Sequence, residues 1–444
     1  MSTLNELTAT QAASGLAAGD FSAEQLMRDC LGRVTEREDD VRAWAYIDPD
    51  HALQQARAAD THRANGGDLG PLHGLPVGIK DIIDTADMPT ENGSPIYQGR
   101  QPSLDATCVA ALRAAGAIIM GKTVTTELAN INSSKTRNPH DLEYSPGGSS
   151  AGSGAGVADF HMPLALGTQT GGSVIRPASF NGVYGLKPTL GLIPRGGVLL
   201  QSHTLDTLGV YGRTIEDLAL ITDSLSIHDP RDPQSHAGNR ASLRAAYRTK
   251  PAAPPRFAFL KTPAWEQADS GAQEAITDVA RRLGASCQEA DLPAPFDRVI
   301  DLHAAIFAGE NAHYYGGHLD ERPELLSEKL RARLQANKDT PARDYVEALT
   351  KRETIHDDFE TLLERYDAVL CLPAAGPAPH GFETTGSAIF NGLWTYLGVP
   401  CISLPRLTVD GMPLGVQLVG KRGEEGKLLR TARWLDSFLA SEAG

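Results

Sequence analysis

The chain has 444 residues, of which 41% are hydrophobic and 22% charged, a composition typical of a globular protein with a large core. Its 41 Lys and Arg residues against 55 Asp and Glu residues give a net charge of −14, which argues against a nucleic-acid-binding protein, because such proteins usually carry a basic face. The five cysteines are scattered and never in CxxC spacing, so they indicate buried free thiols instead of a disulfide framework or a zinc site.

The beginning of the chain argues against a secreted protein, and its short apolar runs argue against a membrane-spanning one. The segment MSTLNELTATQ lacks a basic stretch followed by an apolar core, so we expect no signal peptide. No apolar run approaches the ~18 residues that a membrane-spanning helix needs. We therefore expect a cytoplasmic protein with no membrane contact.

The first half of the chain changes character near residue 66. Residues 5–65 show helical periodicity, with a capping box that pairs Ser22 with Gln25. A buried strand is predicted for VGIKDII (77–83), and a helix and the strand AIIM (117–120) follow. Residues 140–215 are rich in Gly, Ser and Pro and contain short apolar runs, so we expect closely packed loops and strands around a site.

The second half is mainly helical from about residue 216 to about residue 364. A loose segment at 231–255 and the strand RFAFL (256–260) interrupt the helices. Two strand-rich segments then follow, and the second contains Asp410-Gly411, a hairpin signal between two apolar runs. Because helices and strands alternate at both ends and no linker divides the chain, the sequence predicts one large α/β domain.

Two short motifs suggest other activities, and their surroundings argue against both. GAIIMGKT (116–123) matches the phosphate-loop pattern, but its four central residues should form a strand, which cannot wrap phosphates. GSSAG (148–152) matches the nucleophile elbow of α/β-hydrolases, but the residues before it, NPHDLEYSPG, are typical of a loop and not of the required strand.

A third pattern joins a lysine to glycine-flanked serines. Ser173 follows two glycines in TGGSVIRPASF, yet no histidine near it in the chain could serve as its base. Lys80 ends the apolar run VGIK, and burial lowers the pKa of a lysine, so its neutral amine could be that base. The alternative is a lysine that forms a salt bridge with Asp81 or Asp84.

Together these segments resemble the amidase signature family of serine hydrolases. The resemblance covers GLPVGIKDIIDT, GKTVTTELA, SPGGSSAGSGAGVA, PLALGTQTGGSVIRPASFNGVYGLKPT and two late segments, NGLWTYLGVPCISLP and PLGVQLVG. It implies a single α/β/α domain (1–444) with a central mixed, twisted sheet flanked by helices. Within it we expect a helical part (1–65), a catalytic core (66–215), a variable helical part for substrate access (about 216–360) and C-terminal strands and a helix (361–444).

The resemblance also implies a catalytic triad. Ser173 would be the nucleophile, Ser149 would relay the proton and Lys80 would be the final base. The peptide bond between Gly148 and Ser149 would be cis. Ser150 would support Lys80 by hydrogen bonding, the alternative being a structural serine in a tight turn. The oxyanion would be held by backbone N–H groups of a short turn made by Thr170, Gly171, Gly172 and Ser173.

Two departures from the family pattern bear on the substrate. Gln169 replaces an aspartate of many members, and the arginine lies at Arg176, one position later than usual, after Ile175. This variant resembles malonamidase, a branch that acts on a small carboxylate-bearing amide, so Arg176 is a candidate for binding a substrate carboxylate. The alternative is an arginine that pairs with a structural acid.

The sequence therefore predicts an amidase that cleaves the C–N bond of a carboxamide through an acyl-enzyme. Cleavage of a carbamate, a urethane or an aryl acylamide is the nearest alternative, and a glutaminase-type subunit of a tRNA-dependent amidotransferase is ranked below it. A catalytically dead binding protein is disfavoured because the triad is complete. We expect a small-molecule amide or carbamate as the partner, no nucleic acid, no cofactor and no metal, and we leave a homodimer open.

Several other residues are weaker candidates. His303, His313 and His318 do not have the spacing of metal ligands on one helical face, so we expect them to be solvated. Lys187 is expected to form a structural ion pair. Three aromatic residues could line an acyl pocket or belong to the core: Tyr315, Trp394 and Tyr396.

Overall fold

The computed structural model describes residues 3–236 and 241–441, and within them one mixed sheet of 11 strands forms the centre of the molecule. The strand order is β1-β3-β2-β4-β6-β5-β10-β11-β9-β7-β8, with parallel pairs at β3-β2-β4 and at β9-β7-β8. The strands are β1 (Trp44–Ile47), β2 (Pro76–Lys80), β3 (Ile118–Thr123), β4 (Leu164–Gln169), β5 (Tyr184–Lys187), β6 (Thr207–Gly212), β7 (Phe257–Phe259), β8 (Cys287–Glu289), β9 (Ala368–Cys371), β10 (Cys401–Val409) and β11 (Met412–Val419).

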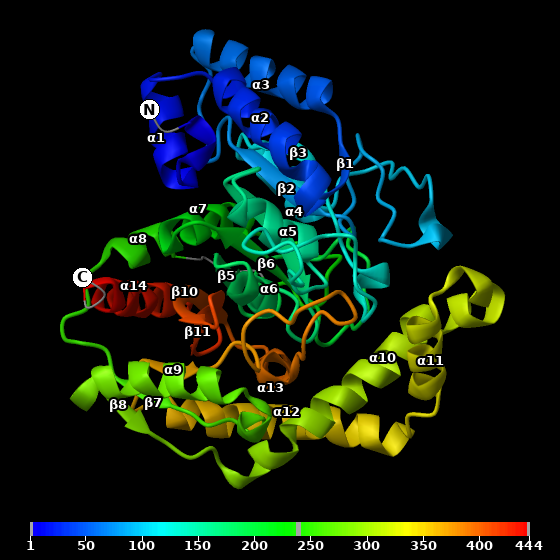
Figure 1. The fold of residues 1–444 in the computed structure, drawn as a ribbon, viewed down its shortest axis with the longest axis vertical. Helices are drawn as coiled ribbons and strands as arrows, with labels where there is room; N and C mark the ends of the chain where they lie inside the picture. The colour runs from blue at the N-terminus through cyan, green and yellow to red at the C-terminus, as the bar shows by residue number, and fades with distance from the viewer. Residues whose placement is uncertain (1–2, 237–240, 442–444) are drawn as a thin grey trace.

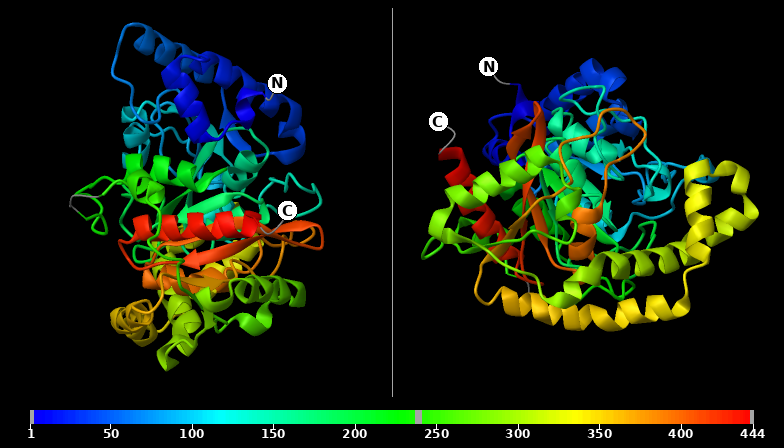
Figure 2. Two further views of the ribbon diagram at one scale, coloured as in Figure 1. Left: turned by 90° about the vertical axis from the view of Figure 1, so that its left-hand side faces the viewer. Right: turned by 60° about the horizontal axis from the view of Figure 1, so that its bottom comes forward.

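Helices cover both faces of this sheet (Figures 1 and 2). The first half contains α1 (Ala9–Ala18), α2 (Ala23–Val41), α3 (Pro49–Ala64), α4 (Thr107–Ala114), α5 (Ala151–Ala158), α6 (Ile175–Phe180) and α7 (Ile215–Leu225). The second half contains α8 (Leu243–Arg248), α9 (Ser270–Arg282), α10 (Val299–Glu321), α11 (Glu328–Lys338), α12 (Ala342–Leu362), α13 (Ile389–Leu397) and α14 (Glu425–Ser441). The fold is thus the single α/β/α domain that the sequence predicts.

Several local predictions are confirmed. Ser22 caps α2 by accepting a hydrogen bond from the N–H of Gln25, and the Gln25 side chain completes the capping box. Asp410 and Gly411 have φ angles of 51° and 79° and connect β10 to β11, which form an antiparallel pair. The segment at 116–123 contains strand β3, as its apolar residues require.

Two predictions for the first half are incomplete. Residues 140–215 contain the predicted loops and strands but also the helices α5 and α6, and the mainly helical residues 5–65 also contain the strand β1. The helix α5 consists of small residues, and all of them except the last are buried. The glycine-rich composition of this segment is typical of loops, so the sequence did not indicate a helix. The same small residues let the helix backbone pack closely against the sheet.

The predicted loose segment at 231–255 contains the short helix α8, and its residues 237–240 lie outside the described part of the chain.

In the ranges 3–236 and 241–441, none of the helices combines the length and apolar character needed to cross a bilayer.

Close packing of α5 makes Gly152 a sensitive position. A Cβ atom there would lie 2.1 Å from the carbonyl oxygen of Ala43 and 2.5 Å from the backbone nitrogen of Val124. Both are backbone atoms that cannot rotate away. By contrast, a Cβ atom at the exposed Gly32 on α2 would meet nothing within 4 Å.

We therefore predict that Gly152→Ala lowers the free energy of unfolding by about 1–3 kcal/mol, the usual range for overpacking. The control Gly32→Ala should be neutral or should raise it by up to about 1 kcal/mol, because alanine favours a helix more than glycine does. Urea unfolding of the two variants checks this. Equal effects of the two substitutions would contradict the close packing of α5.

Candidate active site

Three segments that are distant in sequence meet at one edge of the sheet. Lys80 is the last residue of β2, Ser149 lies two residues before the start of α5, and Ser173 lies in the turn after β4. Strands β2 and β4 are parallel neighbours, with Ile79 paired to Leu166. The carboxyl ends of parallel strands lie at the same edge of a sheet, which is where open α/β sheets place their ligand sites. The sheet thus brings Lys80 close to the glycine-rich turn.

The Lys80 amine is fully buried and bonded to two hydroxyl groups. Its Nζ atom lies 2.7 Å from Ser149 Oγ and 2.7 Å from Thr168 Oγ1. Burial lowers the pKa of Lys80 well below its ordinary value, and the carboxylate of Asp206 opposes this shift. A buried amine with a lowered pKa favours its neutral form, which can accept a proton.

The alternative in which Lys80 pairs with Asp81 or Asp84 is wrong. Asp81 lies 3.5 Å from the Nζ atom of Lys122, and Asp84 forms an ion pair with Arg100 at 2.6 Å. The two acids that follow Lys80 in sequence therefore contact other cations.

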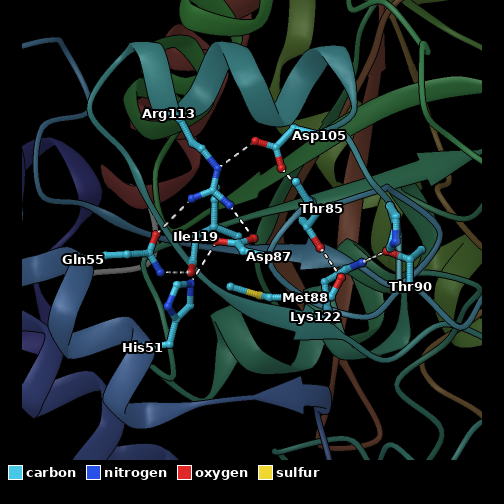
Figure 3. Close-up of polar contacts among 12 residues, drawn as sticks. His51, Gln55, Thr85, Asp87, Met88, Thr90, Asp105, Arg113, Ile119 and Lys122 are labelled. Atoms are coloured by element: carbon cyan, nitrogen blue, oxygen red, sulfur yellow. Dashed lines mark hydrogen bonds and ion pairs between the residues drawn. The ribbon is translucent and has the colours of Figure 1, made fainter. Parts of the chain in front are cut away.

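The phosphate-loop interpretation of residues 116–123 is also excluded. Lys122, the lysine of that motif, is buried in strand β3 and donates to Thr90 Oγ1 and to the carbonyl oxygen of Ile83. Figure 3 shows Lys122 beside Thr90. A lysine held in this way is part of the core and cannot bind a nucleotide.

Ser149 and Ser150, which precede α5, differ in their local structure: one follows a cis peptide bond and the other is hydrogen-bonded to the backbone. The bond between Gly148 and Ser149 is cis, as the resemblance implied. Ser150 makes its hydrogen bonds to the backbone nitrogen and oxygen of Thr168, each at 3.2 Å. The expected bond from Ser150 to Lys80 is therefore replaced by contacts that hold Thr168, which itself contacts the Lys80 amine.

The turn at residues 170–173 directs its N–H groups inward because its carbonyl groups are bonded to the surrounding protein. The acceptors and their donors are Thr170 O with His303 Nε2 (2.9 Å), Gly171 O with Thr395 Oγ1 (2.8 Å), Gly172 O with Arg176 N (3.0 Å) and Ser173 O with the Tyr211 hydroxyl (3.1 Å). Within the described ranges, the N–H groups of Gly171, Gly172 and Ser173 make no hydrogen bond. Such unpaired N–H groups are suited to bind an oxyanion.

The side chain of Gln169 attaches the turn to the helix that follows it. Its Oε1 atom accepts hydrogen bonds from the N–H groups of Val174 (2.9 Å) and Ile175 (3.0 Å), at the beginning of α6. Its Nε2 atom donates to Thr395 Oγ1 at 3.0 Å. Gln169 therefore satisfies backbone groups at the start of α6 and ties the turn to α13.

Ser173 and Ser149 both face a cavity of about 420 Å³. Ser173 is partly exposed, whereas Ser149 is buried. Within the described chain their two hydroxyl groups make no direct hydrogen bond, and in ligand-free enzymes such contacts often form only when substrate binds. The other walls of the cavity come from helices α10, α11 and α13 and from residues 129–131, 201, 385, 386 and 388.

Arg176 lies in the wall of the same cavity and is 4% exposed. Its Nη2 atom donates to the carbonyl oxygen of Gly148 at 2.6 Å and to Thr385 Oγ1 at 3.2 Å. Its Nε and Nη1 atoms are buried without a hydrogen-bond partner, and burial lowers the pKa of Arg176 to about 10. The alternative in which Arg176 pairs with a structural acid is not supported, because the described residues provide no such partner.

The structure shows where the weaker candidates from the sequence lie. Tyr315, Trp394 and Tyr396 belong to the core and do not line the cavity. Lys187 is buried and donates to the carbonyl oxygens of Pro188 and Val399, so the expected ion pair is wrong.

Sequence reasoning missed two contributors to the site. His303 was expected to be solvated, but it holds the turn through Thr170 and its pKa is lowered by burial. Thr168, the second contact of Lys80, was not singled out. The signal for Thr168 was its place on β4, two residues before Thr170; His303 lies 130 positions from Ser173 (303 − 173), and no sequence signal connects it to the turn.

Comparison with known proteins places this arrangement in a family. Residues 25–429 match the Amidase family. The chain belongs to this family of amidase signature enzymes. It is therefore an amidase, a hydrolase that acts on carbon–nitrogen bonds.

Individual relatives agree over almost the whole chain. A glutamyl-tRNA(Gln) amidotransferase subunit of Chloroflexus aurantiacus is 34% identical over 473 residues, which cover 97% of this chain and 96% of that protein. An amidase crystal structure superposes with a TM-score of 0.86 at 30% identity, covering 97% of this chain and 99% of that one. The peptide amidase of Stenotrophomonas maltophilia gives 0.81 at 28% identity, covering 97% and 96%.

Proposed function

We propose that this amidase cleaves its substrate with Ser173 as nucleophile, Ser149 as proton relay and Lys80 as final base. The observation that supports this assignment is the 2.7 Å contact between the buried Lys80 amine and Ser149 Oγ. A serine hydroxyl is a poor nucleophile without a base, and Lys80 provides one because burial lowers its pKa and so favours the neutral amine.

The first chemical step moves two protons and forms one bond. Lys80 takes the proton of Ser149, Ser149 takes the proton of Ser173, and Ser173 Oγ attacks the carbonyl carbon of the amide. The resulting oxyanion accepts hydrogen bonds from the unpaired N–H groups of the turn at 170–173. The loss of one such donor typically costs a hydrolase ~2.7–4 kcal/mol of transition-state stabilisation.

Collapse of the tetrahedral intermediate needs a proton at the leaving nitrogen, because an amine anion is a very poor leaving group. The protonated Lys80 returns its proton through Ser149 to this nitrogen, and the amine leaves. Water then attacks the acyl group on Ser173, with the same two residues accepting its proton. The second tetrahedral intermediate releases the carboxylic acid and restores the Ser173 hydroxyl.

For the acyl group we propose a short chain that ends in a carboxylate, as in malonamate. Arg176 supports this choice, because its guanidinium group lies at the cavity wall with two buried nitrogens that lack a partner. A substrate carboxylate could accept hydrogen bonds from both nitrogens and so offset the free-energy cost of leaving them buried without a partner. The motif variant around Arg176, which resembles malonamidase, points to the same class.

Two other substrate classes compete with this proposal. Carbamates and aryl acylamides present the same kind of carbonyl group to Ser173, so the triad does not distinguish them. The 34% identity with a glutamyl-tRNA(Gln) amidotransferase component favours glutamine as a second candidate substrate, with this chain as one part of a larger enzyme.

A pH profile tests the role of Lys80. Only the neutral amine accepts a proton, so kcat/KM of the wild type should rise with pH through the lowered pKa of Lys80 and then level off. We predict that Lys80→Ala lowers the rate by about 10²–10⁴-fold, the range for loss of a general base, and removes this acid limb. Lys187→Met, which changes a buried lysine that donates to two backbone carbonyl oxygens, should keep it. An unchanged acid limb in Lys80→Ala would remove Lys80 as the base.

A substrate comparison tests the role of Arg176. We predict that the wild type hydrolyses malonamate with a higher kcat/KM than a neutral aryl amide, and that Arg176→Gln loses about tenfold or more on malonamate alone. Ser173→Ala serves as the inactive control. A preference for the aryl amide would make Arg176 structural and direct attention to carbamates and anilides. A preference for glutamine, seen only with added partner chains, would favour the amidotransferase function.

A further inference from the structure

The active-site cavity carries positive charge that the proposed mechanism does not use. Although the chain has a net charge of −14, none of the described residues that line this cavity is Asp or Glu. Two arginines line it, Arg176 and Arg333. The proposed function gives a role to Arg176 only.

One face of α10 connects the nucleophile turn to Arg333. Its cavity-lining residues follow the pattern i, i+3, i+4, i+7, i+8 that is typical of one face of a helix: Ile300, His303, Ala304, Phe307 and Ala308. His303 contacts Thr170 O, and Phe307 lies about one helical turn, ~6 Å, farther along the axis. The ring of Phe307 stacks on His303 and is covered by the guanidinium group of Arg333, whose Cζ atom lies 4.5 Å from the ring centre.

Among the residues that the structure describes, Arg333 has no acidic partner. It lies on α11 between Lys329 and Lys338, which form ion pairs with Glu383 and Asp320. Arg333 forms no ion pair within residues 3–236 and 241–441, and its guanidinium group contacts the ring of Phe307 instead. Burial alone lowers the pKa of Arg333 to about 10, so the group is still charged at neutral pH.

We propose that Arg333 and Phe307 form a second anion-binding subsite for the amine portion of the substrate. This inference rests on the proposed function: a short acyl chain whose carboxylate binds Arg176 has no remaining group that could extend to Arg333. The second acidic group must then belong to the amine that leaves. The substrate class is an amide that joins a short dicarboxylic acid to an amino acid.

The geometry assigns a different task to each residue of this subsite. The planar guanidinium fork of Arg333 suits a carboxylate, because it donates two parallel hydrogen bonds. The ring of Phe307 keeps the fork in place by a cation–π contact and offers an apolar surface to the carbon chain of the amine. The competing explanation is that Arg333 only connects α11 to α10.

The test compares two substrates that differ in one remote group. N-malonyl-β-alanine carries a carboxylate on the amine side, and its terminal carboxamide replaces that charge with a neutral group of similar size. We expect the wild type to favour the acid in kcat/KM, and Arg333→Gln to lower the acid-to-carboxamide ratio by about tenfold or more. Arg333→Lys should keep part of the preference.

Arg331→Gln is the matched control, because Arg331 lies on the same helix, is exposed and does not line the cavity. It should leave the ratio unchanged. A ratio that is unchanged in Arg333→Gln, or equal losses on both substrates, would overturn the subsite and leave Arg333 as a structural contact. A wild type without preference for the acid would overturn it as well.

Failure of the subsite and failure of the proposed function give different results. Turnover by Ser173→Ala would refute the nucleophile, whereas an inactive Ser173→Ala combined with an unchanged ratio in Arg333→Gln would refute the subsite alone. Calorimetry with Ser173→Ala provides a readout without turnover. There N-malonyl-β-alanine should bind about tenfold or more tightly than its carboxamide, and the added Arg333→Gln change should remove the difference. Equal binding of the two compounds would contradict the subsite.

Discussion

The burial of one amine at the end of β2 is the constraint on which the rest of the site depends. The aliphatic part of Lys80 lies in a fully buried strand, and its Nζ atom contacts hydroxyl groups of Ser149 and Thr168 and, among the described residues, no carboxylate. A charged ammonium group in such a place is costly unless it is paired, so the site favours the neutral base. The acids nearest in sequence are engaged by Lys122 and Arg100, which keeps them away from Lys80.

A second constraint fixes the turn that holds Ser173. The carboxylate of Asp206 accepts hydrogen bonds from Thr170 Oγ1 (2.5 Å) and from the N–H groups of Gln201 (2.7 Å) and Ser202 (3.1 Å). Gln169, Asp206 and the donors to the turn carbonyls thus hold the turn from several sides, while the N–H groups of residues 171–173 make no hydrogen bond within the described chain. Preorganised donors of this kind stabilise a developing charge without further rearrangement.

The sequence predicted those elements that depend on residues adjacent in the chain. The capping box at Ser22, a buried strand that contains Lys80 and the hairpin at Asp410-Gly411 follow from neighbouring residues, although the strand ends at Lys80 and not at residue 83 as predicted. Helix α5 was missed because its three glycines and its serine disfavour a helix, which forms here through packing against the sheet. The family motifs identified the residues at the site, but the contacts of Thr168, His303 and Arg333 depend on long-range packing that no short motif encodes.

The most direct test of the central claim is to map the nucleophile by covalent labelling. The wild type would be treated with a fluorophosphonate, whose phosphorus is attacked by an activated serine with loss of fluoride, and the product analysed by intact-protein and peptide mass spectrometry. The account predicts one adduct per chain, on Ser173, and greatly slowed labelling in Lys80→Ala. An adduct on a different residue, or equally fast labelling without Lys80, would contradict it.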